Sequence, residues 1–401
     1  MRILLVHNFY QQFGGEDQVV LHELERLKEK HDVYFYSRHN NDLLQLGAIG
    51  KVSAVMGTLD SQRTRADIRA LVRESRPDVA YLHNIYPLIS PSIYHVLHSL
   101  GVPIVQVIHD FRPLCANGWF YNEGGVCERC KTGNYLHAIR HRCYKGSYAY
   151  SALYAAALTY MRGSGALEKV DAFVCLTEFA RRKLLSAGVP GERLFVRPNC
   201  IDAATIEPAV GSGDYIGYIG RLSKEKGVWT LIHAMERVCG PVLKLAGTGP
   251  EESAIRDYIE AKRIKNIQLL GFISGTERQE FLRNCMFSIM PSQWYEMFPM
   301  VLLEVWASGK PVIGSRLGAT ADLIEEGMTG LLFESGDPVD LARKIDSLYR
   351  TPERVARMGS QARALVERKY SPAASHSLLM QIFHQVRRRD MPTASAVLGT
   401  T

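Results

Sequence analysis

Short apolar runs alternate with longer amphipathic segments along the whole chain, which is the order expected when parallel strands are joined by helices. In the first half, the predicted strands are residues 1–6, 33–35, 79–82, 104–108, 172–176 and 194–196, and the predicted helices are 16–28 and 60–74. In the second half, the predicted strands are residues 215–219, 242–245, 267–269, 287–290 and 312–313, and the predicted helices include 228–238 and 251–262. The pattern predicts two doubly wound α/β units of similar size.

A stretch containing Pro, Gly and Ser, residues 206–214 (IEPAVGSGD), predicts the boundary between the two units. The first domain is then residues 1–205, with a cysteine-rich insertion at about residues 112–150, and the second is residues 206–371. A late helix at about residues 372–390 is expected to cross back to the first domain. Residues 391–401 are small and polar, and we expect them to be disordered.

The composition is that of an ordinary globular protein, with 401 residues, 46% hydrophobic and 22% charged. The net charge of +7 does not indicate nucleic acid, because an anionic cofactor or an anionic membrane fits it equally well. The longest lipid-friendly stretch, residues 146–161, is shorter than the roughly 20 apolar residues of a spanning helix. We therefore expect a cytoplasmic protein, with no nucleic-acid partner, that is able to touch a membrane.

Chemistry-bearing loops follow the strands of the second half, where open α/β sheets bind their ligands. Arg221 and Lys226 lie five residues apart in GRLSKEKG and offer a fork and a point charge to phosphate oxygens. A solvated charged turn is the alternative. Gly247 in AGTGPE allows a close backbone approach, although most such turns are only tight connections. Phe272 follows another strand, at a place where backbone groups can meet a base.

Two carboxylates flank a helix start in WYEMFPMVLLE, where Pro299 suits the first helical position. Glu296 lies in the loop and Glu304 in the second turn. A carboxylate only accepts hydrogen bonds, so each suits a sugar diol, and the amides at a helix start favour a pyrophosphate. The alternative is that Glu304 pairs locally and Glu296 faces solvent.

The segments GRLSKEKG, AGTGPE, EMFPMVLLE, GKPVIGS and TGLLF occur in the order and spacing of the family-4 retaining glycosyltransferases. The chain resembles this family over essentially its whole length, and the four-cysteine insertion would mark a subgroup. The resemblance implies the GT-B fold, in which two Rossmann-like doubly wound parallel-sheet domains face a cleft. It implies a nucleotide-diphosphate sugar donor, UDP- or GDP-linked, and a glycan or lipid-linked acceptor in bacterial surface polysaccharide synthesis.

The resemblance also implies roles for single residues in the second half. Glu296 would contact the donor sugar and Glu304 the ribose, while Arg221 and Lys226 would hold the diphosphate. Pro299 stands where the family often has glycine and removes one amide donor. The remaining contacts of this loop are expected from Met297, Phe298 and Met300, and Asp322 stands where glutamate is commoner.

In the first half, Gly14 and Gly15 follow the first strand and resemble the glycine loop at which donor phosphate and acceptor approach the backbone. His109 matches the histidine near the reaction centre, and the pair His83 and Asn84 is expected to line the acceptor cleft. Retention then follows a front-face route, with no protein nucleophile and no catalytic metal. The alternatives are a GT-B nucleotide-sugar epimerase and a catalytically silent nucleotide-sugar-binding protein.

Four cysteines cluster at Cys115, Cys127, Cys130 and Cys143, in a polar, loop-rich segment. In a cytosolic chain, a CxxC flanked by two more cysteines predicts a structural Zn²⁺ site, with His137 and His141 as substitute ligands. Two disulfides or four free thiols are the alternatives.

Residues 126–170 hold seven Lys or Arg against two acids, together with six tyrosines. A basic, aromatic segment can lie on an anionic membrane. An insertion packed on the first domain, with its charges in water, is the alternative. The sequence carries no inference on oligomeric state.

Overall fold

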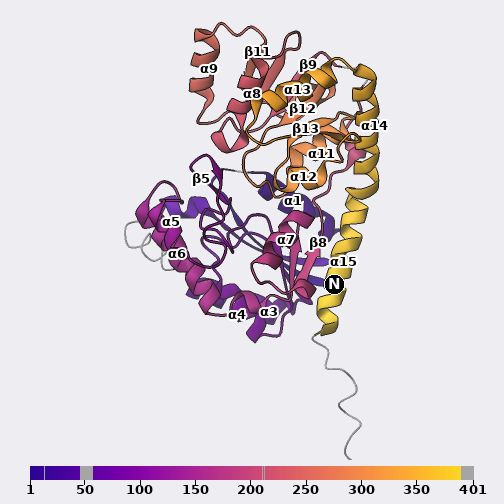
Figure 1. The fold of residues 1–401 in the computed structure, drawn as a ribbon. Helices are drawn as coiled ribbons and strands as arrows, with labels where there is room; N and C mark the ends of the chain where they lie inside the picture. Colours follow the sequence, from indigo (N-terminus) through magenta and orange to yellow (C-terminus); the bar gives the residue numbers. More distant parts are fainter. Residues whose placement is uncertain (13, 46–56, 210, 212, 390–401) are drawn as a thin grey trace, which may run out of the picture.

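The computed structural model describes residues 1–12, 14–45, 57–209, 211 and 213–389. The predicted disordered tail, residues 391–401, lies outside the described residues. Two six-stranded parallel sheets, one per half of the chain, lie one above the other with helices around them (Figure 1).

The first sheet has the order β2-β1-β3-β4-β7-β8. Its strands are β1 (Arg2–Phe9), β2 (Asp32–His39), β3 (Val79–Leu82), β4 (Ile104–Ile108), β7 (Ala172–Cys175) and β8 (Leu194–Val196). The insertion after β4 contains a short antiparallel hairpin of two-residue strands, β5 (Tyr121–Asn122) and β6 (Gly125–Val126). The second sheet has the order β11-β10-β9-β12-β13-β14. Its strands are β9 (Tyr215–Ile219), β10 (Leu243–Ala246), β11 (Ile267–Gly271), β12 (Cys285–Met290), β13 (Val312–Ser315) and β14 (Gly330–Phe333).

Helices cover the faces of both sheets. In the first half they are α1 (Gly15–Lys28), α3 (Gln62–Ser75), α4 (Ser92–Ser99), α5 (Leu136–Arg140), α6 (Tyr148–Gly163) and α7 (Glu178–Ser186). In the second half they are α8 (Val228–Met235), α9 (Glu252–Ala261), α10 (Gly275–Asn284), α11 (Met300–Ala307), α12 (Gly318–Leu323), α13 (Pro338–Tyr349), α14 (Pro352–Lys369) and α15 (Pro372–Arg389).

The central strands are buried on both faces, which is why they read as continuous apolar runs in the sequence. Every residue of β3, β4 and β9 is buried. Each of these strands ends at the edge of its sheet where the candidate site residues begin. The predicted fold class, two parallel-sheet domains of the GT-B type, is confirmed.

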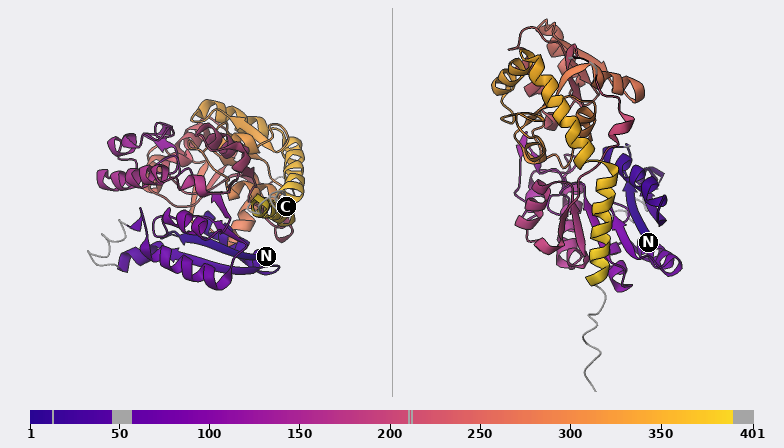
Figure 2. Two further views of the ribbon diagram at one scale, coloured as in Figure 1. Left: turned by 90° about the horizontal axis from the view of Figure 1, so that it is seen from below. Right: turned by 90° about the vertical axis from the view of Figure 1, so that its right-hand side faces the viewer.

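The last helix returns to the first sheet, as predicted. Only Tyr370 and Ser371 lie between α14 and α15, and Figure 2 shows α14 on the second domain and α15 on the first. In the first domain, the Arg197 Nε donates to the Ser375 carbonyl oxygen of α15 at 3.0 Å. The rings of Tyr81 and Phe383 meet edge to face at 5.3 Å.

Two local expectations need correction. Pro299 is the N-cap of α11 and has an extended backbone, so the helix begins one residue later, at Met300. The segment Gly330–Phe333, which is absent from the predicted strands, forms a buried edge strand, β14, paired with β13.

Candidate active site at the junction of the two sheets

Glu296 lies in the loop between β12 and α11, and its side chain is only 7% exposed. Its Oε1 accepts three hydrogen bonds, from Lys226 Nζ at 2.7 Å, Ser292 Oγ at 2.7 Å and Trp294 Nε1 at 2.9 Å. Burial opposes ionisation of Glu296, but the Lys226 charge and these hydrogen bonds hold its pKa below the ordinary value. Within the described residues, no donor reaches Oε2, which leaves that oxygen able to accept from a ligand.

The basic pair does not converge on one partner. Lys226 is held by Glu296 and lies over the Trp294 ring, with its Nζ 5.0 Å from the ring centroid. Arg221 is exposed, and no acid in the described part of the chain pairs with its guanidinium. Arg221 therefore carries an unneutralised positive charge at the carboxyl end of β9.

Glu304 lies in the second turn of α11, eight residues after Glu296. Arg278 of α10 binds its Oε2 through two nitrogens, with Nε at 2.9 Å. The partner of Glu304 is thus 26 positions away in the sequence, and Oε1 of Glu304 has no donor among the described residues.

The loop around the helix start offers backbone amides. Met297 and Phe298 are buried and Met300 is half-buried. The amides of these residues donate to no acceptor in the described part of the chain. They precede or open α11, where the helix dipole favours negative charge.

Gly247 and Phe272 have different surroundings. A Cβ on Gly247, whose φ is +139°, would lie 1.9 Å from the Gly220 carbonyl oxygen. This glycine is therefore required by the close approach of two loops, whatever ligand binds. Phe272 is 74% exposed at the end of β11, so its ring is free to cover a bound group.

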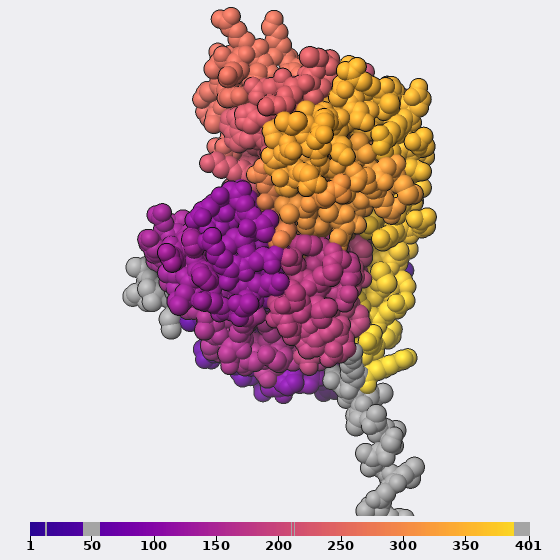
Figure 3. Space-filling view, viewed as in Figure 1, coloured from indigo at the N-terminus to yellow at the C-terminus, as the bar shows by residue number. Residues whose placement is uncertain are grey.

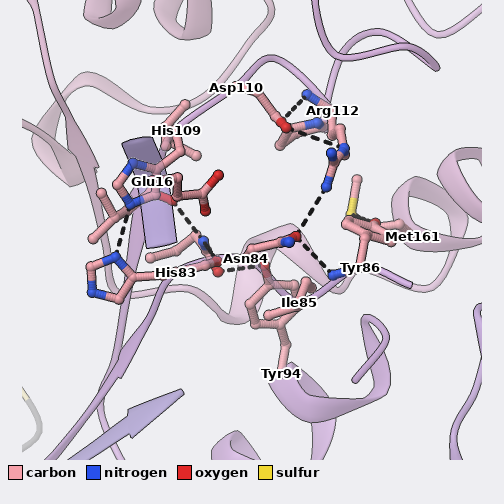
Figure 4. A pocket seen from close by; sticks show the side chains of 14 residues that line it. Glu16, His83, Asn84, Ile85, Tyr86, Tyr94, His109, Asp110, Arg112 and Met161 are labelled. Carbon is pink, nitrogen blue, oxygen red and sulfur yellow. Dashed lines mark hydrogen bonds and ion pairs between the residues drawn. The ribbon is translucent and has the colours of Figure 1, made fainter. Parts of the chain in front are cut away.

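The first sheet contributes a pocket at the carboxyl ends of β3 and β4 (Figure 4), and His83, Asn84 and His109 line it. His83 Nδ1 and His109 Nε2 are 2.8 Å apart and the rings stack at 5.1 Å. Burial lowers the pKa of His109 to about 4 and that of His83 well below its ordinary value. Both imidazoles are therefore neutral at pH 7 and suited to hydrogen bonding.

Sequence reasoning missed the charged residues of this pocket. Arg112 donates from Nη1 to Asn84 Oδ1 at 3.0 Å and pairs through Nε with Asp110 Oδ2 at 3.1 Å. Glu16 accepts from the Tyr10 hydroxyl at 2.7 Å, while its Oε1 is buried without a partner among the described residues. The sequence signal for Glu16 is that it directly follows the glycine pair, in the turn that resembles the family's glycine loop.

The glycine loop itself is open. A Cβ on Gly15 would meet nothing within 4 Å, so the protein's own packing does not require glycine there. Two residues further, Asp17 is fully buried and binds His7 Nε2 at 2.8 Å and the Gly14 amide at 3.0 Å. These bonds fix the start of α1 beside the pocket.

Asp322, the departure from the family pattern, makes an ion pair between the two domains. Arg182 of α7 binds both of its oxygens, at 2.8 and 2.9 Å.

All four clustered cysteines line one small cavity in the insertion. Across the described residues, however, no three His, Cys, Asp or Glu side chains are arranged to hold a metal ion as they stand. Burial, and then the neighbouring thiols, raise the pKa of Cys130 to about 12 and that of Cys143 to about 11. The four sulfurs are gathered, but a metal site is not shown.

Comparison with known proteins agrees with this architecture. The family described as Glycosyltransferase Family 4 matches residues 13–205, and the family described as Glycosyl transferases group 1 matches residues 205–365. The two matches adjoin, and the chain belongs to the family-4 type of GT-B glycosyltransferases.

Particular relatives agree with that class. The α-D-kanosaminyltransferase of Streptomyces kanamyceticus is 27% identical over 85% of this chain and 84% of its own. The capsular polysaccharide biosynthesis glycosyltransferase CapM of Staphylococcus aureus is 29% identical over 39% of this chain and 42% of its own. The structure of Anabaena HepE in complex with UDP superimposes with a TM-score of 0.69 at 17% identity, over 97% of this chain and 100% of its own. That last likeness concerns the fold alone.

Among the described residues, none of the helices combines the length and the apolarity that crossing a membrane requires.

Proposed function

We propose that this glycosyltransferase moves a sugar, with retention, from a nucleotide-diphosphate sugar to a glycan or lipid-linked acceptor in polysaccharide synthesis. The observation that carries the proposal is the Glu296 carboxylate. Three donors hold one of its oxygens, and the other oxygen is free to accept from a ligand hydroxyl next to the N-terminus of α11. CapM, whose name places it in capsular polysaccharide biosynthesis, supports the acceptor class.

In this scheme residues 206–371 bind the donor. The ionised Glu296 accepts from sugar hydroxyls, and Glu304 Oε1 accepts from the ribose. Arg221, Lys226 and the amides before and at the start of α11 stabilise the negative charge that develops on the leaving diphosphate, which is the largest contribution such a site makes. Phe272 covers the base, and Gly247 keeps the neighbouring loop in place. HepE was solved with UDP and with UDP-glucose, so UDP-sugars are the first donors to test.

Residues 1–205 and α15 form the acceptor side. A Cβ on Gly15 would meet nothing within 4 Å, and the next residue, Glu16, lines the pocket in Figure 4. Neutral His109 lies at the reaction centre, held by His83, and the unpartnered Glu16 Oε1 accepts from an acceptor hydroxyl. The incoming hydroxyl attacks from the side on which the diphosphate leaves, so no protein nucleophile is needed.

A thermal-shift screen against UDP- and GDP-sugars identifies the donor, and product analysis with and without a glycan acceptor identifies the reaction. We expect Glu296→Gln to abolish the sugar-dependent part of the affinity, while Glu280→Gln, at an exposed site on α10, leaves it unchanged. Release of an epimerised nucleotide sugar without acceptor would overturn the proposal. Tight nucleotide-sugar binding with no turnover on any acceptor would do so as well.

The four thiols are proposed to hold one structural Zn²⁺, which would replace their protons and tie together a segment that has little core of its own. Elemental analysis of purified protein is expected to give about one zinc per chain. A folded protein with no zinc and four reactive thiols would exclude it.

The exposed face of α5 and α6 is proposed to rest on an anionic membrane. Leu136 is 71% exposed, Tyr148 59% and Tyr150 50%. Arg142 and Lys145 lie over the rings of these two tyrosines, at 5.5 and 5.4 Å. Flotation with vesicles containing phosphatidylserine at low salt is expected to carry the protein, and Arg142→Gln with Lys145→Gln to weaken this. Absence of flotation of the unaltered protein would rule the contact out.

A further inference from the structure

Glu128 stands between Cys127 and Cys130 in the insertion of the first domain, yet its carboxylate contacts the loop that carries Glu296. Glu128 Oε1 accepts from the Tyr295 hydroxyl at 2.8 Å and forms an ion pair with Lys183 of α7. Its Oε2 lies 3.4 Å from Lys131 Nζ. The carboxylate thus joins three segments, of which one belongs to the second domain.

The ring of Tyr295 is inserted among aromatic side chains of the first domain. Its centroid lies 4.7 Å from that of Phe179, 6.2 Å from Phe120 and 6.4 Å from Phe111. Lys183 Nζ lies 4.8 Å from the ring centroid. Tyr295 is therefore held on its ring and on its hydroxyl by residues of the opposite domain.

The residue before Tyr295 is held in the same way. The Trp294 ring meets that of Trp119, which precedes β5 in the insertion, edge to face at 5.4 Å. The indole Nε1 of Trp294 in turn donates to Glu296 Oε1 at 2.9 Å. Both residues before Glu296 therefore contact side chains of the first domain. Figure 3 shows the insertion, in purple, against the second domain, in orange.

We infer that Glu128 is a positioning residue of the donor site. By holding Tyr295, it fixes the loop on which the Glu296 carboxylate is presented to the donor sugar. The cysteine-bearing insertion of the first domain then helps to position the donor site of the second domain. The effect on substrate rests on the proposed role of Glu296, whereas the effect on the loop does not.

Two substitutions test the contact without removing a ring. Tyr295→Phe keeps the ring in its aromatic surroundings and removes only the hydroxyl. Glu128→Gln keeps the shape and removes the charge that pairs with Lys183. The control is Glu123→Gln in the same insertion, where the Glu123 side chain is 65% exposed and binds only His141 among the described residues.

The first measurement is hydrogen–deuterium exchange of residues 291–299 in the ligand-free protein. We expect exchange about tenfold faster in both variants and no change in Glu123→Gln. Tyr295→Phe removes the hydrogen bond to the Glu128 carboxylate, and Glu128→Gln replaces that charged acceptor with a neutral amide oxygen that no longer pairs with Lys183. Unfolding temperatures are measured alongside, so that a global loss of structure is recognised. Exchange at the unaltered rate in both variants would overturn the inference, and Tyr295→Phe decides if Glu128→Gln does not fold.

The second measurement is calorimetric titration with UDP, GDP, UDP-glucose and GDP-mannose. Because the loop presents Glu296 to the sugar, the gain in affinity that the sugar brings should fall about tenfold in both variants, while nucleotide affinity stays the same. An equal loss for nucleotide and nucleotide sugar would show a general disturbance and overturn the positioning role. If none of the four probes binds the unaltered protein, the proposed function fails for these donors, while the exchange experiment still decides the contact.

Discussion

Replacement of Glu16 by glutamine should make the protein's stability less dependent on pH. Burial, and then the charge of Asp110, raise the pKa of the Glu16 carboxyl from 4.5 to about 7, against the opposing influence of His7, Tyr10 and Arg112. A carboxyl whose pKa is raised by folding favours the folded state while it is protonated. That contribution is complete below the unfolded pKa of 4.5 and is lost as the pH rises towards about 7.

The magnitude follows from the two pKa values. The difference between 4.5 and about 7 corresponds to about 3 kcal/mol, at about 1.4 kcal/mol per pKa unit. Part of it is already lost at pH 5, so about 2.5 kcal/mol should appear between pH 5 and pH 9. Glutamine has nearly the same shape and never ionises, so the variant escapes this loss.

Urea unfolding of Glu16→Gln and of the unaltered protein at a series of pH values measures the effect. The free-energy difference between them should grow in favour of the variant as the pH rises, because all other titrations cancel. Glu25→Gln, at an exposed position of the same helix, is the matched control and should show a flat difference. A difference for Glu16→Gln that stays constant within about 0.5 kcal/mol would refute the reasoning.

Three further substitutions have expected outcomes. Lys226→Ala should lower the transfer rate about 10²–10³-fold and leave the circular dichroism spectrum unchanged. Lys224→Ala, at an exposed position of the same loop, should leave the transfer rate unchanged. Near-normal turnover by Lys226→Ala would contradict the role of Lys226. Gly247→Ala should destabilise the second domain by about 3 kcal/mol in urea unfolding, because its Cβ would lie 1.9 Å from a carbonyl oxygen, and Gly125→Ala should be neutral. Arg197→Met should lower the free energy of unfolding by about 3–5 kcal/mol, because buried Glu23 loses the guanidinium that pairs with it. Adding Glu23→Gln should recover part of this loss. No recovery would count against the buried-charge explanation.

Much of the fold was predictable because parallel strands are buried on both faces. The bounds of β3, β4 and β9 agree with the predicted strands for this reason. The strand β14 was not among the predicted strands, although it is buried throughout. The helix α11 was placed one residue early because proline is common both at the first helical position and just before it.

The residues of the candidate site divide in the same way. The sequence identifies two pairs of site residues because each pair lies within a few residues of the chain after a predicted strand. These pairs are Arg221 with Lys226 and Glu296 with Glu304. The contact between Glu128 and Tyr295 joins residues 167 positions apart, and no local pattern encodes such a pair. The one hint was an acid between two cysteines, which draws attention to the thiols instead.

The return of α15 to the first domain has a consequence for synthesis on the ribosome. The second domain has all its strands and α14 once residue 369 has been made, while the first domain still lacks its last helix. Until α15 emerges, Tyr81 lacks the Phe383 ring and Arg197 lacks the Ser375 carbonyl oxygen. Domains usually complete in the order in which they are translated. Here the domain that starts first is the one that finishes last, and the first 205 residues made alone would carry an uncovered apolar face.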